Sequence, residues 1–144
     1  MKPTLLFLSS RAPFPLHGGD AIRAYHLMRE LSEVFQIHLL ALIEGGEDQV
    51  ELQRGLLLPA GPCTQVEFHC VPRRQSIAGA IKALLVGEPI QVGYYRCAAV
   101  KDRVKALSGE VDAVVSHLVR MAPYAELLDV PRLLEYTDAL SLFL

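Results

Sequence analysis

The stretch Thr4–Ser9 (TLLFLS) and the loop that follows it, RAPFPLHGG at residues 11–19, give the clearest indication of the fold. The first six residues form a continuous apolar run, which is typical of a β-strand buried on both faces. The loop that follows contains two prolines and a Gly-Gly pair, and it leads into a helical pattern. A buried strand of this kind predicts a parallel sheet covered by helices on both faces.

The rest of the chain alternates short apolar runs with helical patterns. Further strands are predicted at residues 36–43, 65–71, 111–117 and 132–136. Helices are predicted at 21–35, 48–58, 76–86, 92–107 and 121–128, with a break near Gly93 in the fourth of these. Asp20 is expected to be the N-cap of the first helix. This order predicts an α/β, Rossmann-like fold: a doubly wound, mostly parallel sheet of about five strands with right-handed crossovers.

Composition limits the classes of function. The chain has 144 residues, 51% hydrophobic and 21% charged, so we expect one domain with a sizeable core. The net charge of -2 gives no electrostatic case for nucleic acid binding. Three cysteines without a CxxC pair indicate reduced thiols in a cytoplasmic protein. The spacing of Cys63 and Cys70 suits no zinc site, and no acidic DxD cluster is present, so no metal is expected.

Contact with a membrane is expected to be superficial at most. The apolar run Leu5–Leu8 is too short for a signal peptide, and no run approaches the ~18 residues of a spanning helix. Arg73, Arg74 and Lys82 accompany an apolar helical segment at 77–86, which could touch an anionic membrane. A plain core helix is the favoured interpretation of that segment.

The loop after the first strand is a candidate anion site. Gly18 and Gly19 let a ligand approach the backbone closely, and the helix N-terminus that follows suits a phosphate. Arg11 and Arg23 add positive charge beside Asp20. Neither a GxGxxG fingerprint nor a P-loop is present. The alternative, a stiff loop that caps a helix and carries two solvated arginines, stays open.

Further candidates follow the fourth and fifth strands. His117 ends the fourth predicted strand, at the edge where open α/β sheets bind ligands, and it could bond a substrate or carry a proton. A histidine bonded to a neighbouring loop is the alternative. Arg120 could be a second polar group on the same rim, or a solvated arginine. His17 could reach a ligand beside the glycines, and Asp138 either faces the cleft or caps a helix.

The segment RAPFPLHGGDAIRAYHLMRELS, residues 11–32, resembles the opening of family-4 glycosyltransferases of the two-Rossmann-domain (GT-B) type. It is most similar to bacterial sugar transferases associated with exopolysaccharide synthesis. The resemblance continues in order along the chain through Glu88-Pro89, Tyr94 and Tyr95, Asp112, His117, the APY segment at 122–124 and EYTDALS at 135–141.

The resemblance implies roles for the candidate residues. Gly18 and Gly19 would line the cleft near the donor diphosphate and the acceptor, and His117 would contact the transferred sugar. Arg11, Asp20 and Arg23 match motif positions without a defined task. The resemblance also implies a nucleotide-sugar donor without any cofactor, a saccharide or lipid-linked acceptor, and a cytoplasmic location that can include the inner face of the membrane.

A two-domain transferase also needs a second Rossmann-like domain, which 144 residues cannot supply. The sequence ends in the apolar segment ALSLFL at residues 139–144, and we expect a truncated or excised domain. The chain is therefore expected to be the acceptor-side half of a transferase, inactive without a C-terminal donor domain. The alternative is a non-catalytic binding or interaction module that self-associates through the surface the second domain would cover.

Overall fold

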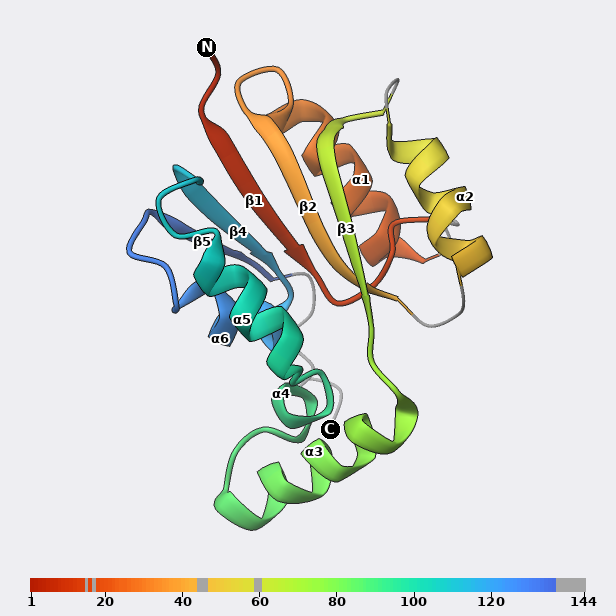
Figure 1. Cartoon of the computed structure of the whole chain (residues 1–144), viewed down its shortest axis with the longest axis vertical. Coiled ribbons are helices and arrows are strands. Elements are labelled where there is room, and N and C mark those ends of the chain that lie inside the picture. The colour runs from red at the N-terminus through yellow and green to blue at the C-terminus, as the bar shows by residue number, and fades with distance from the viewer. Residues whose placement is uncertain (15, 17, 44–46, 59–60, 137–144) are drawn as a thin grey trace.

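The computed structural model describes residues 1–14, 16, 18–43, 47–58 and 61–136. Their strands form one sheet in the order β3-β2-β1-β4-β5, and all four pairings are parallel (Figure 1). The strands are β1 (Thr4–Ser9), β2 (Gln36–Ile43), β3 (Cys63–Cys70), β4 (Ala113–His117) and β5 (Arg132–Glu135). The predicted α/β fold with about five strands is confirmed.

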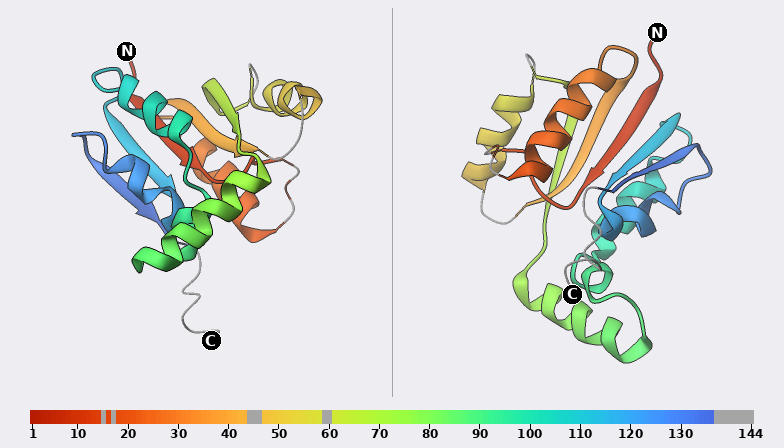
Figure 2. Two further views of the ribbon diagram at one scale, coloured as in Figure 1. Left: turned by 60° about the horizontal axis from the view of Figure 1, so that its bottom comes forward. Right: turned by 180° about the vertical axis from the view of Figure 1, so that it is seen from behind.

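Helices cover both faces of the sheet, which divides the core in two. One face carries α1 (Gly19–Leu31) and α2 (Glu47–Leu57), and the other carries α5 (Ala98–Ala106) and α6 (Ala122–Ala125) (Figures 1 and 2). Along β1, Phe7 packs with Met28 on the first face, whereas Leu6 and Leu8 pack with Val104 on the second. The alternating direction of strand side chains explains why TLLFLS is apolar at nearly every position.

The order of the strands reverses between β1 and β4. The chain moves outward from β1 through β2 to β3, then crosses to the other side of β1 to form β4 and β5. Ser9 and His117, the last residues of β1 and β4, lie opposite each other in the register. The loops that follow these two strands diverge, and this is where open parallel sheets leave a crevice.

Several predicted boundaries need correction. The first helix begins at Gly19 with Gly18 as its N-cap, so Asp20 lies in the first turn and is not the cap. The helical segment predicted at 92–107 is interrupted, as expected, but it forms two helices, α4 (Ile90–Tyr94) and α5, and the break follows Tyr94. The predicted 121–128 helix is a 3₁₀ turn, η1 (Val119–Met121), followed by the single turn of α6. His17, Asp138 and the segment 139–144 lie outside the described residues.

The prediction of a plain core helix at 77–86 was wrong. Helix α3 (Arg73–Val86) projects from the body of the domain and packs on α4 through small residues; Gly79 and Gly93 approach so closely that a Cβ on either would collide with the other's carbonyl (Figures 1 and 2). Its large apolar side chains point to solvent instead: Ile77, Ile81, Leu84, Leu85 and Val86. The sequence showed that the helix is apolar but not which face of it is buried.

A polar cluster links β2, β3 and α5. Arg103 donates to both carboxylate oxygens of Glu67, with Nε at 2.8 Å and Nη2 at 2.6 Å, and His38 Nε2 lies 2.8 Å from the same carboxylate. The hydrogen bonds from Arg103 lower the pKa of Glu67. Burial lowers the pKa of His38 and outweighs the opposing effect of Glu67. The cluster therefore favours a charged Glu67 and a neutral His38 at neutral pH.

This cluster should make stability depend on pH. In the unfolded chain, His38 takes up a proton below a pH of about 6.5, whereas in the folded chain its pKa is lower. The unfolded chain therefore binds more protons as the pH drops from 7 to 5, and the free energy of unfolding should fall. Burial also lowers the pKa of His117, which adds to the same trend. In His38→Gln the loss between pH 7 and 5 should be smaller than in the wild type, as measured by urea unfolding at each pH. An unchanged loss would contradict this assignment.

Candidate functional site at the carboxyl ends of β1 and β4

The loop after β1 is held by side-chain hydrogen bonds. Ser9 Oγ donates to the Arg11 carbonyl at 2.7 Å, which turns the chain immediately after the strand. The buried amide of Gln53, on α2, bonds both the N–H and the carbonyl of Phe14. Gln53 thus anchors the loop to the neighbouring helix. Sequence reasoning missed Gln53, because a polar residue in a helical pattern does not show which distant backbone it bonds.

The loop after β1 leads into α1, whose N-terminus has no side-chain cap. Gly18 has a φ of +87°, a conformation that favours glycine, and α1 has no side-chain cap. Gly19 is helical, and a Cβ added there would meet no described atom within 4 Å. Arg11 reaches back to Asp20, with 3.3 Å between Nη1 and Oδ2. The first-turn N–H groups of α1 could therefore accept an anion beside Arg11.

A buried histidine–glutamate pair lies on the other side of the crevice. Nδ1 of His117 is 2.7 Å from Oε2 of Glu135, the last residue of β5, and both side chains are less than 10% exposed. Neither ring nitrogen of His117 has a well-aligned hydrogen bond in the described structure, so the short contact with Glu135 is not an ideal hydrogen bond. Burial lowers the pKa of His117, while Glu135 opposes that shift. His117 is therefore neutral at pH 7, with Nε2 unpartnered in the described structure.

Arg23 belongs to this pair and not to the glycine loop. Its Nε forms an ion pair with Oε1 of Glu135, which ties α1 to β5. Sequence reasoning expected Arg23 to be a possible anion ligand and did not consider Glu135. A single glutamate at the end of a predicted strand gave no sign of its partners, because β5 reaches His117 and Arg23 only through the sheet topology.

Strain is stored directly after His117. Leu118 has a φ of 71° and a ψ of 152°, a backbone region almost confined to glycine, and its N–H bonds the Glu135 carbonyl at 3.0 Å. Such a conformation costs about 1–3 kcal/mol and is concentrated at functional sites. The structure therefore holds His117 in place at an energetic cost, which marks this end of β4 as a candidate site.

Two hollows adjoin the site. A small one, lined by Asp20, His117 and the loop after β1, has a volume of about 10 Å³, which is room for about one water molecule. A larger cleft of about 380 Å³ shares Ser10, Arg11 and Ala12 with it and extends to Tyr94 and Tyr95. The second volume suits a small ligand. Ser10 lines both hollows, and its buried hydroxyl has no partner in the described structure, so Ser10 is a candidate contact that sequence reasoning missed.

Arg120 lies apart from the other candidates. Its Nη1 donates to the Tyr95 hydroxyl at 2.9 Å, and its guanidinium lies 4.8 Å from the centre of the Tyr95 ring. It lines a different pocket, on the face of the sheet that carries α5. The structure thus brings Arg11, Asp20 and His117 together around the small hollow and connects Arg23 to them through Glu135. Gly18 and Gly19 lie next to Asp20 at the start of α1, and Arg120 contacts Tyr95 instead.

The residues that the structure describes include no group of three or more His, Cys, Asp or Glu side chains able to hold a metal ion. Burial raises the pKa of Cys63 to about 12, so its thiol is unreactive at neutral pH. In the described part of the chain, no helix is both long and apolar enough to cross a bilayer.

Comparisons with models of known protein families, with curated proteins and with solved structures found no match to this chain. The fold and the site place this chain in a broad structural class. It is a Rossmann-like α/β domain with a polar crevice at the point where the strand order reverses. The crevice offers a cation, an open helix N-terminus and a neutral imidazole. Those groups suit a ligand with an anionic part and hydroxyl groups.

The pairing of His117 with Glu135 can be tested by titration. Glu135→Gln removes the carboxylate that raises the pKa of His117, so that pKa should fall below its wild-type value. NMR titration of the histidine ring protons measures the shift directly. His38, which faces Glu67 instead, should titrate as in the wild type. A His117 pKa that stays constant or rises would rule out the pairing.

Proposed function

We propose that this chain is the acceptor-side domain of a two-domain, GT-B-type glycosyltransferase, which moves a sugar from a nucleotide-sugar donor to a saccharide or lipid-linked acceptor. The observation that carries the proposal is the placement of the buried His117–Glu135 pair beside the loop after β1, at the point where strand order reverses. The order of motifs that resembles family-4 transferases supports it. Such a domain would act only together with a donor-binding domain.

The proposal assigns a role to each side of the crevice. The open N-terminus of α1 and Arg11 would face the donor diphosphate, because both favour negative charge and no side chain caps the helix. His117, kept neutral by burial, would bond a hydroxyl of the transferred sugar through Nε2. The small hollow holds about one water, so the sugar would lie over the rim of the crevice and be enclosed from above by the second domain.

The larger cleft would receive the acceptor. It adjoins the loop after β1, and the rings of Phe14, Tyr94 and Tyr95 line it. Aromatic faces beside a few polar groups are a common surface for sugar rings and other small ligands. A cytoplasmic location with contact to the inner face of a membrane is part of the proposal; α3, with exposed apolar residues and no acidic residue, is the surface that supports such contact.

Reconstitution tests the catalytic role. The chain is joined to a donor-binding domain of a family-4 transferase, and sugar transfer from a nucleotide sugar is measured. His117→Ala should lower kcat by roughly 100-fold or more if His117 acts on the reacting sugar. His117→Gln, which keeps a hydrogen-bonding side chain, separates loss of chemistry from loss of folding, which circular dichroism follows in parallel.

The matched control is His26→Ala, on the exposed face of α1, which should transfer sugar at the wild-type rate. Absence of transfer with every nucleotide sugar and donor domain tried would refute the proposal. So would transfer that His117→Ala leaves unchanged.

A non-catalytic interaction module is the second candidate, and the edge strand β5 favours it. Leu133 and Leu134 are adjacent, so their side chains point to opposite faces of the sheet, and both are exposed, at 55% and 44%. Exposed apolar side chains on an edge strand favour pairing with another chain. A second copy could add its β5 to this edge and bury these leucines.

Sedimentation distinguishes the two candidates. A self-associating module should show a dimer at micromolar concentration, and Leu134→Lys should shift it to monomer because a charge would be buried in the interface. Lys105→Ala, on the outer surface of α5, is the control and should leave the dimer intact. A wild-type chain that stays monomeric throughout this range would exclude self-association.

A further inference from the structure

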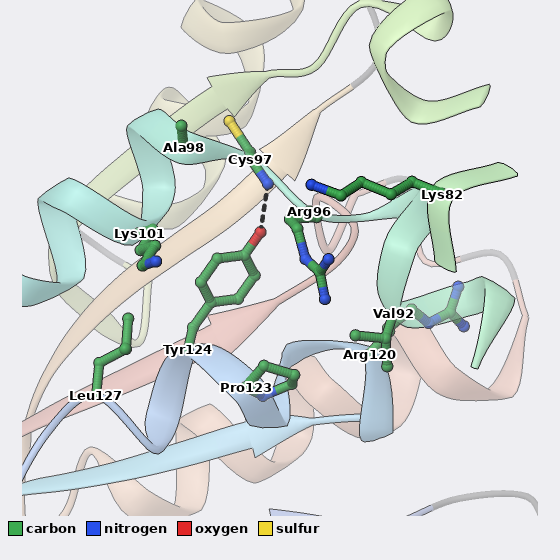
Figure 3. A pocket seen from close by; sticks show the side chains of 10 residues that line it. All are labelled: Lys82, Val92, Arg96, Cys97, Ala98, Lys101, Arg120, Pro123, Tyr124 and Leu127. Carbon is green, nitrogen blue, oxygen red and sulfur yellow. Dashed lines mark hydrogen bonds between the residues drawn. The ribbon is translucent and has the colours of Figure 1, made fainter. Parts of the chain in front are cut away.

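A third, strongly basic pocket, separate from the two hollows at the switch-point crevice, lies on the face of the sheet that carries α5 and α6. Its volume is about 470 Å³, within the range of small-ligand sites. Among the described residues, no acidic side chain lines it, whereas four cationic residues from four different segments do: Lys82, Arg96, Lys101 and Arg120. Figure 3 shows Lys82 and Arg96 extending into the pocket on one side of the Tyr124 ring, with Lys101 on the other.

Most of this charge is not neutralised. Arg96 forms an ion pair with Glu88, with 2.6 Å between Nη2 and Oε2. The ammonium groups of Lys82 and Lys101 have no partner among the residues that the structure describes. Nε of Arg120 is buried and also lacks a partner there, although its Nη1 bonds Tyr95. Like charges gathered around one hollow repel each other unless an anion lies between them.

The Tyr124 side chain fixes the floor of the pocket, and the N-terminus of α5 adds further positive potential beside it. The Tyr124 hydroxyl accepts a hydrogen bond from the Cys97 N–H at 2.7 Å and donates one to the Tyr95 carbonyl at 2.6 Å. These bonds fix the segment before α5, a nine-residue helix without a side-chain cap, whose first residue, Ala98, lines the pocket. The N-terminal end of α5 therefore adds its dipole to the unpaired lysines. The remaining lining is apolar: Val92, Pro123 and Leu127.

The geometry points to a binding site for a phosphate ester in this pocket. The phosphate would lie between Lys82 and Lys101 at the N-terminus of α5, where the charge is unpaired. The organic group of the phosphate ester would pack against the Tyr124 ring and Leu127. The switch-point crevice shares none of these lining residues, so this site exists whether or not the domain transfers sugars.

Two sources could supply this chemistry: a free phosphorylated metabolite or the headgroup of an anionic lipid. Lys82 belongs to α3, whose outward residues Ile81 and Leu85 are exposed apolar side chains. Arg73 and Arg74 extend the positive charge along the same helix, which has no acidic residue. A lipid surface could therefore approach the pocket from the side of α3.

Binding of two probes tests the site and separates the sources. Inorganic pyrophosphate is titrated into the ¹⁵N-labelled chain, and amide shifts of Ala98 and Lys101 are followed by NMR. In parallel, vesicles of phosphatidylcholine with phosphatidic acid are compared with phosphatidylcholine alone in a flotation assay. Lys82→Ala and Lys101→Ala should each weaken binding about tenfold, because each removes a charged contact to the phosphate.

Lys105→Ala is the matched control, because it removes the same charge from α5 outside the pocket; it should change affinity by no more than about twofold. Pyrophosphate binding with these effects supports a soluble phosphorylated ligand. Vesicle binding alone, with the same dependence on Lys82 and Lys101, supports a lipid headgroup. Binding of neither probe, or equal effects of all three lysine variants, would overturn the proposal.

Discussion

Strand β1 pairs with β2 on one side and with β4 on the other, and both halves of the core are built around it. Leu6, Phe7 and Leu8 are fully buried. Because their side chains point alternately to the two faces of the sheet, Leu6 and Leu8 pack in one core and Phe7 packs in the other. Because β1 is central, the chain must reverse its strand order next to it. That reversal brings the ends of β1 and β4 together and opens the loops after them into one crevice.

Charge at this crevice is arranged by elements distant in sequence. Glu135 on β5 receives Arg23 from α1 and faces His117 on β4, so one buried carboxylate connects three elements. A buried carboxylate is stable only when it is paired, which makes the orientation of all three side chains interdependent. The strained backbone at Leu118 is maintained within the same arrangement. The crevice is therefore preorganised, as a site that binds a specific ligand requires.

The helices at the carboxyl edge of the sheet carry two unusual surface features. Small residues let α3 and α4 pack closely, and the large apolar residues of α3 are left facing solvent. This inverted pattern is unfavourable for an isolated surface helix, because exposed apolar area remains in contact with water. Beside it, cations from α3, α5 and η1 and from the segment between α4 and α5 converge without enough acidic partners. Both features support the proposal that another molecule binds at this edge of the sheet.

The class of fold, a first strand buried on both faces and the position of the loop after it were predictable from the sequence, because apolar runs and turn residues are local signals. The position of His117 at a strand end was predictable for the same reason. The contacts between distant side chains were not predictable: Glu135 with His117, Gln53 with Phe14, and Arg120 with Tyr95. The sequence pattern of α3 was apolar on most sides, so it could not show which face is buried. Contacts between distant residues depend on strand order and helix orientation, which no local pattern encodes.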